Sequence, residues 1–271
     1  MNLPTSFYDS EEQYMAENFI NNGYVKSSVF SPLLLDKVRE LIIGLAAEHL
    51  GHAVIRNPAD FLNNIHTLIS AHELNEMRLY IIKKMNQEKW LRPVYYQLAS
   101  NALNMVVGNE LAMQMRVNLS IQLPGDDTSL LPVHADAWSG DSPFEVVLWL
   151  PLVDCYRTKS MYLLPPEPTQ ALHNNFSEFA GKSSEDIFRK IEKDVQWMDV
   201  DYGDFLIFNQ NLPHGNRINN EGKTLWSLSC RFKSVFSPYA DKKLGEFFEP
   251  ITLRAATRIG MSYQLPGEFN D

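Results

Sequence analysis

Residues Leu131–Trp138 read LPVHADAW and carry the most informative pattern in the chain. Side chains alternate between two faces in an extended segment, so His134 and Asp136 point the same way and the residue between them points away. An imidazole nitrogen and a carboxylate oxygen can therefore reach one point in space. A later stretch, Asn209–Asn216, reads NQNLPHGN and offers a second imidazole at His214.

Two imidazoles and one carboxylate form a donor set that binds a cation from one side. The opposite coordination positions stay open, which is how non-heme Fe(II) sites keep room for substrate and dioxygen. A His-x-Asp pair alone is a common pattern, and an ordinary surface or core histidine beside an aspartate explains it equally well. The prediction of a metal site at His134, Asp136 and His214 therefore depends on the second stretch and on the strand that follows it.

The composition indicates a globular protein of 271 residues, 45% of them hydrophobic, which suffices for a substantial core. The formal net charge is −9 and Lys and Arg form no long run, which argues against a nucleic-acid partner. Cys155 and Cys230 lack Cys-x-x-Cys spacing and fit a reducing compartment, although one disulfide stays open. The acidic start and the lack of an apolar run of about 20 residues predict neither a signal peptide nor a membrane span, so we expect a cytoplasmic protein.

Periodicity predicts an α+β fold, with a helix-rich part over residues 1–110 before a strand-rich part over about 111–238. We expect one domain over 1–271, with 239–271 as a C-terminal extension, because no repeat or linker marks a boundary. Helices are expected over 10–22, 33–50, 57–85 with a break near 70, 89–107 and 176–193, and strands over 24–30, 113–123, 144–153, 160–164, 205–208 and 224–236. The helices should cover one side of an antiparallel sheet pair or barrel.

Two of the expected strands carry polar side chains on one face and apolar side chains on the other. This pattern is typical of a half-buried strand with a polar inner surface. A fixed guanidinium beside hydroxyl groups suits a bidentate grip on a carboxylate. The polar members are Arg116, Asn118, Ser120 and Gln122 in the first strand, and Ser227, Ser229 and Arg231 in the last.

The order of these features resembles the Fe(II)/2-oxoglutarate-dependent oxygenases, nearest the phytanoyl-CoA dioxygenase-like branch. The resemblance covers residues 15–237 and includes an opening motif, FINNGYV, ahead of the first long helix. It implies a double-stranded β-helix, also called a jelly roll and cupin-like. In that fold Fe(II) would be held by His134, Asp136 and His214, with 2-oxoglutarate and dioxygen as cosubstrates.

The resemblance also implies which residues bind the cosubstrate. Arg231 would bind the far carboxylate of 2-oxoglutarate, with Ser229 or Ser227 assisting. In the family this arginine commonly lies closer to the second histidine than Arg231, which is 17 residues after His214. Arg217 is only 3 residues after His214, and the choice between the two arginines stays open.

Other residues near the predicted site have two readings. Gln122, with Asn118 on the same face, resembles a residue that touches the cosubstrate, but a solvated strand face explains it as well. Trp138 and Asp141 follow the first ligands and either line the substrate mouth or pack, and Arg217 is a second candidate for substrate contact. His173, in a polar insertion, is not expected to be a ligand.

The resemblance implies hydroxylation of a small-molecule substrate, because family members that halogenate carry a small residue in place of Asp136. A small polar metabolite is expected, such as a sugar or an intermediate of secondary-metabolite biosynthesis, and the oligomeric state stays open. A cupin-type metal-dependent isomerase or a non-catalytic sugar-binding jelly roll would share the fold without needing Arg231. A zinc hydrolase could use the same ligands, but no carboxylate stands out as its general base.

Overall fold

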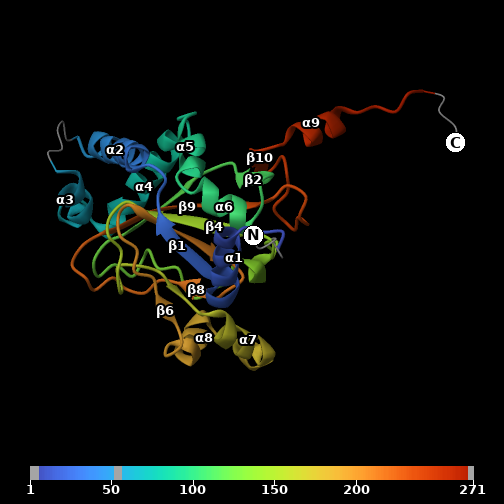
Figure 1. Cartoon of the computed structure of the whole chain (residues 1–271). Helices are drawn as coiled ribbons and strands as arrows, with labels where there is room; N and C mark the ends of the chain where they lie inside the picture. Colours follow the sequence, from blue (N-terminus) through green and yellow to red (C-terminus); the bar gives the residue numbers. More distant parts are fainter. Residues whose placement is uncertain (1–5, 52–56, 268–271) are drawn as a thin grey trace.

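The computed structural model describes residues 6–51 and 57–267, and a large antiparallel sheet lies at its centre (Figure 1). Within these residues the large sheet has seven strands in the order β1-β7-β4-β9-β2-β10, with β3 also paired to β9. Their bounds are Tyr24–Ser28 (β1), Leu111–Gln114 (β2), Asn118–Gln122 (β3), Val146–Pro151 (β4), Asp204–Asn209 (β7), Leu225–Ser234 (β9) and Phe248–Pro250 (β10). A smaller sheet joins β6 (Gln196–Trp197), β5 (Tyr162–Leu163) and β8 (His214–Gly215).

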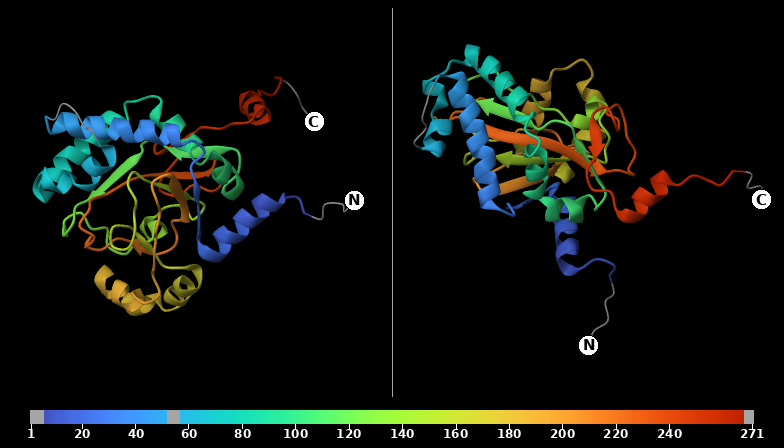
Figure 2. Two further views of the ribbon diagram at one scale, coloured as in Figure 1. Left: turned by 60° about the vertical axis from the view of Figure 1, so that its left-hand side comes forward. Right: turned by 90° about the horizontal axis from the view of Figure 1, so that it is seen from above.

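Helices cover one side of the large sheet, as the sequence predicts (Figures 1 and 2). The long helix α2 begins at Pro32 because the Ser31 side chain accepts a hydrogen bond from the Leu34 amide and caps it. A capping box between Ser70 and Glu73 starts α4 at the expected break. The helices before the sheet are α1 (Ser10–Asn22), α2 (Pro32–His49), α3 (Pro58–Asn63), α4 (Ala71–Met85), α5 (Leu91–Gln97) and α6 (Ser100–Val106), with a 3-10 turn η1 (Ile65–Thr67).

Later helices lie on the opposite side of the large sheet or leave the body of the protein. The insertion between β5 and β6 holds α7 (Pro166–Asn174), the 3-10 turn η3 (Phe176–Phe179) and α8 (Ser184–Ile191). Ser183 caps α8, which begins later than the helix expected over 176–193, and α7 was not predicted. In both views of Figure 2 the last helix, α9 (Ala255–Ser262), extends away from the rest of the chain.

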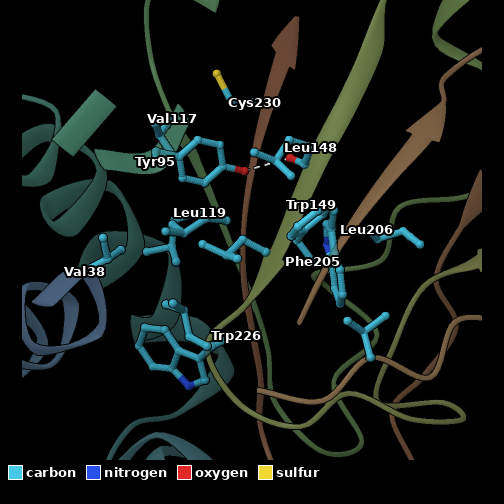
Figure 3. Packing of buried hydrophobic residues seen from close by; sticks show 14 of the residues in the cluster. Val38, Tyr95, Val117, Leu119, Leu148, Trp149, Phe205, Leu206, Trp226 and Cys230 are labelled. Atoms are coloured by element: carbon cyan, nitrogen blue, oxygen red, sulfur yellow. Dashed lines mark hydrogen bonds between the residues drawn. The ribbon is translucent and has the colours of Figure 1, made fainter. Parts of the chain in front are cut away.

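One hydrophobic cluster joins the helices to the large sheet (Figure 3). The polar atoms that it buries are satisfied. The Tyr95 hydroxyl donates to the Leu148 carbonyl at 2.7 Å, and Trp226 Nε1 donates to the Leu62 carbonyl at 2.9 Å. These bonds tie α5 and α3 to the central strands, which makes the sheet a rigid support for its other face.

The expected strand over 113–123 is two strands, and the reason is a side chain from α4. Asn86 Nδ2 donates to the Val117 carbonyl at 2.9 Å, and the Val117 amide donates to Asn86 Oδ1 at 2.8 Å. The amide group thus replaces a neighbouring strand at this point, and β2 ends before β3 begins. The register that follows places Asn118 opposite Ser229 and Ser120 opposite Ser227.

None of the helices in the described ranges is long and apolar enough to cross a bilayer. The prediction about a signal peptide concerns residues 1–14, the first five of which lie outside the described residues, as does the end of the chain at 268–271. That residues 1–271 form one domain stays a prediction.

Candidate metal centre

The structure brings His134, Asp136 and His214 together, each with one ligand atom within 4.8 Å of the others. The two histidines lie opposite each other in an antiparallel bridge, where the His134 amide donates to the His214 carbonyl at 3.0 Å and the reverse bond measures 2.8 Å. Asp136 begins the 3-10 turn η2 (Asp136–Ser139), and its amide donates to the Gln210 carbonyl at 3.0 Å. Backbone pairing between the two motif stretches therefore assembles all three ligands.

Both imidazoles are oriented by the backbone two residues upstream. His134 Nδ1 lies 2.8 Å from the Pro132 carbonyl, and His214 Nδ1 lies 2.8 Å from the Leu212 carbonyl. A carbonyl only accepts, so each Nδ1 carries the proton and each Nε2 presents a lone pair. This hydrogen bond from the second ring nitrogen is typical of metal-ligating histidines.

The electrostatics of the site favour a neutral histidine beside an ionised aspartate. Burial lowers the pKa of His214 to about 4, and the neighbouring His134 adds to this effect. Burial alone would raise the pKa of Asp136, but the Arg231 guanidinium and the His214 imidazole outweigh it, and the pKa lies below its usual value. A neutral His214 imidazole and an ionised Asp136 carboxylate, with His134 beside them, fit a divalent cation, because metal ligands must be deprotonated.

Arg231 lies beside the candidate ligands and is held by three partners. Its Nη2 donates to Asp136 Oδ2 at 2.8 Å, and its Nε donates to Gln210 Oε1 at 3.0 Å and lies 3.5 Å from Asp141 Oδ2. Asp141 is buried and also pairs with Lys242, from the C-terminal part of the chain. Arg231 thus holds Asp136 Oδ2, the carboxylate oxygen on the side away from His134. The contacts with Gln210 and Asp141 in turn hold the Arg231 guanidinium in place.

A cavity of about 310 Å³ opens beside the three ligands, between the two sheets. Strand β9 lines it with Leu225, Ser227, Ser229 and Arg231, which share one face because strand side chains alternate. Beside them in the same sheet, β3 and β4 contribute Asn118, Ser120, Val147 and Trp149. The smaller sheet and its flanks contribute Ser160, Met161, Gly215 and Asn216. Most of the polar inner face that the sequence predicts lines this cavity, but Arg116 and Gln122 do not.

Three candidate residues, Gln122, Arg217 and Trp138, do not line the cavity. Gln122 Nε2 donates to the Arg217 carbonyl at 2.7 Å, so the Gln122 side chain binds the backbone of the segment after His214. Arg217 pairs with Glu185 of α8 at 2.6 Å and stacks over Phe188, 4.2 Å from the ring centroid. These contacts bind the insertion to the segment after His214 and leave Arg217 outside the site.

Trp138 lies in an aromatic cluster next to the ligands rather than in the cavity lining. Its ring centroid is 4.8 Å from that of Phe176, and its Nε1 donates to His173 Nε2 at 3.3 Å. Its exposed fraction is 36%, so part of the ring faces solvent. His173 is not among the grouped metal-ligand atoms of the described residues.

Sequence reasoning missed two residues that shape the site, Gln210 and Lys242, and gave Asp141 a different role. Gln210 stands in the NQNLPHGN stretch and could have been noted there, because its position is close to His214. Asp141 was considered for the substrate mouth, but it is buried in the ion pair with Lys242. Lys242 carries no local signal, since its contact with Asp141 joins residues far apart in the chain. Gly215 packs so tightly that an added Cβ would lie 2.6 Å from the Leu131 carbonyl oxygen.

Comparison of the sequence with protein-family models gives no match, and comparison with curated proteins gives none either. Solved structures do match. The nickel complex of the non-heme monooxygenase ThoJ aligns with a TM-score of 0.57 and 14% identity, over 90% of this chain and 85% of that chain. EctD from S. alaskensis, solved with 2-oxoglutarate and 5-hydroxyectoine, aligns with a TM-score of 0.55 and 12% identity, over 88% and 80%.

The chain therefore shares the fold of ThoJ and EctD, and the predicted α+β, cupin-like architecture is confirmed. At these identities the likeness concerns the fold alone. Assignment to the phytanoyl-CoA branch stays a prediction.

Proposed function

We propose that this protein is an Fe(II)- and 2-oxo-acid-dependent dioxygenase that hydroxylates a small polar metabolite. The observation that carries the proposal is the set of three ligand atoms within 4.8 Å, two with Nε2 lone pairs and one an ionised carboxylate, at the end of a cavity. Such a 2-His-1-carboxylate set is typical of non-heme Fe(II) oxygenases. The fold shared with ThoJ and EctD supports the same assignment.

The proposed roles follow from the contacts. His134, Asp136 and His214 would hold Fe(II). When bound, Fe(II) would supply the activation of dioxygen, with a 2-oxo acid as the cosubstrate. The backbone carbonyls of Pro132 and Leu212 keep the histidine tautomers that coordination requires. The hydroxyl and amide groups of the cavity would orient the cosubstrate, and the apolar walls would exclude water from the reacting atoms.

The cavity and its surroundings support a small substrate. A volume of about 310 Å³ lies at the lower end of the range for ligand sites. The partly exposed Trp138 ring, backed by Phe176, offers a flat surface beside the ligands. A sugar or another ring-shaped polar metabolite suits such a surface, because an aromatic ring packs against its apolar face and leaves its hydroxyls hydrated.

The first test is anaerobic titration with Fe(II) and 2-oxoglutarate, followed by the weak visible charge-transfer absorption of the complex. We expect the band in the native protein and its loss in Asp136→Ala. Asp194→Ala is the matched control, because Asp194 is exposed and far along the chain from the ligands. A native protein that binds Fe(II) without any band on addition of 2-oxo acids would contradict the proposal.

The second test is product formation. Release of succinate from 2-oxoglutarate, measured across a panel of sugars, amino acids and acyl thioesters, should rise with the true substrate and stay low with the others. The isomerase, sugar-binding and zinc-hydrolase alternatives predict no succinate with any of them. Metal analysis of the purified protein separates iron from zinc.

A further inference from the structure

Among the described residues that line the cavity, Arg231 is the single Lys or Arg side chain. It lies at the end of the cavity where the three candidate metal ligands meet. Arg231 lies opposite Val147, at the level of the three ligands, and its guanidinium is shared among Asp136, Gln210 and Asp141. Gln114 also accepts from the Arg231 amide at 3.3 Å, which fixes the backbone there. Because these contacts hold the Arg231 guanidinium, it is poorly placed to bind the tail of a ligand that extends along the cavity.

The other end of the cavity is neutral. Going along β9 away from Arg231, the inward side chains are Ser229, Ser227 and Leu225. Ser227 is four residues from Arg231, which corresponds to about 13 Å of strand. It faces Ser120 across the β3–β9 pair, so two hydroxyls meet at this level.

This arrangement divides the recognition of a 2-oxo acid into two parts. Every 2-oxo acid has the same head, a keto group next to a carboxylate, and a bound head would lie beside Asp136 and within the field of Arg231. The tail would extend toward Ser229, Ser227 and Ser120. A charged tail meets only neutral hydroxyl donors there, and it gains neither the opposite charge nor the bidentate pair of bonds that a guanidinium would supply. The tail carboxylate must also lose water on entering the cavity.

Building on the proposed function, we propose that this enzyme binds its cosubstrate by the 2-oxo acid head and does not select for a charged tail. The cosubstrate class is then 2-oxo acids in general, including 2-oxo monocarboxylates such as 2-oxopentanoate. In this proposal Arg231 is a positioning residue for Asp136 and for the common head.

The chemistry balances for any member of this class. One oxygen atom of dioxygen enters a substrate C–H bond to give C–OH, and the other enters the 2-oxo acid. The bond between the first and second carbons of the 2-oxo acid breaks, releasing carbon dioxide and a carboxylate one carbon shorter. The 2-oxo acid and the substrate are each oxidised while dioxygen is reduced. 2-Oxoglutarate gives succinate, and 2-oxopentanoate gives butanoate.

The deciding measurement compares the affinities of 2-oxoglutarate and 2-oxopentanoate for the anaerobic Fe(II) protein by the charge-transfer band. We expect the two dissociation constants to agree within about tenfold, a factor that corresponds to 1.4 kcal/mol. A preference for 2-oxoglutarate of a hundredfold or more would overturn the inference and leave the proposed function intact. Absence of the band with both acids, in a protein that binds Fe(II), would overturn both.

Variants of the two arginines test the role of Arg231 through the ratio of these affinities. In Arg231→Gln we expect both acids to lose affinity by a similar factor, because the common head and Asp136 are affected. A loss confined to 2-oxoglutarate would show that Arg231 binds the tail, and would overturn the inference. Arg217→Gln is the matched control and should change neither affinity, since its partner is Glu185 on α8.

A gain of charge at the neutral end provides the converse test. Leu225→Arg would place a cation there, and we expect it to tighten 2-oxoglutarate at least about tenfold relative to 2-oxopentanoate. Leu225→Met controls for the change of shape and should leave the ratio unchanged. If Leu225→Arg folds, binds Fe(II) and leaves the ratio as in the native protein, the tail does not reach this end and the inference fails.

Discussion

Replacing Gly215 by alanine should destabilise the protein and loosen the metal site together. An added Cβ would lie 2.6 Å from the Leu131 carbonyl oxygen and 2.8 Å from the Tyr162 hydroxyl oxygen, well below an ordinary contact of 3.4–4 Å. The Leu131 oxygen cannot retreat freely, because it accepts a hydrogen bond from the Asn216 amide at 3.0 Å. The strand must therefore move by about 0.8 Å at the residue after His214.

The expected cost follows from these contacts. Overpacking costs about 1–3 kcal/mol, and weakening one backbone hydrogen bond adds about 1 kcal/mol. The lower chain entropy of unfolded alanine returns about 0.4–1 kcal/mol. We expect a net loss of about 2 kcal/mol in the free energy of unfolding, seen as a fall of roughly 4–8 °C in Tm.

The assay is thermal unfolding together with Ni(II) binding, and Gly44→Ala is the matched control. Gly44 lies on the exposed side of α2 with nothing within 4 Å of an added Cβ, so its replacement should stabilise by about 0.5–1 kcal/mol. Ni(II) affinity should fall in Gly215→Ala and stay unchanged in Gly44→Ala. Equal or higher stability of Gly215→Ala would refute the packing argument.

Three further changes test other parts of the structure. Tyr95→Phe removes the bond to the Leu148 carbonyl and should cost about 1–2 kcal/mol in urea unfolding, with an unchanged m-value. Tyr162→Phe removes a buried hydroxyl that has no partner among the described residues, so stability should stay the same or rise by up to about 1 kcal/mol; a clear loss would reveal an unrecognised bond. Ni(II) at a hundredfold excess over its Kd should stabilise the native protein by about 2.7 kcal/mol, and EDTA should reverse this. In His214→Ala the same Ni(II) concentration should give a much smaller shift in Tm.

Patterns close in sequence were enough to predict which three candidate ligands the structure brings together, and the order of most elements. His134 and Asp136 are two residues apart on one extended segment, and strand alternation predicts the polar face that became the cavity lining. The apolar spacing that predicts a helix over 33–50 matches α2, which the Ser31 side chain caps. These are local signals, because the chemistry that produces them acts within one or two turns of chain.

Contacts between distant residues could not be predicted in the same way. The division of one expected strand into β2 and β3 depends on Asn86, whose amide reaches Val117 from a helix. The pairing of Arg231 with Asp136 depends on the register of β9 against β4, and sequence alternation gives the face of a residue without giving its level along the strand. The sequence alone could therefore not show that Arg231 pairs with Asp136 or that Arg217 pairs with Glu185.

The two histidines and the aspartate differ in what keeps them in position. Each imidazole takes its orientation from a carbonyl two residues earlier, so both nitrogen donors are ready as soon as the short bridge between them has formed. The carboxylate is fixed from β9, far along the chain, and is ready only when the large sheet is complete. A change that displaced β9 would thus release the carboxylate and leave a pair of oriented imidazoles, and such a pair binds copper or nickel more tightly than Fe(II).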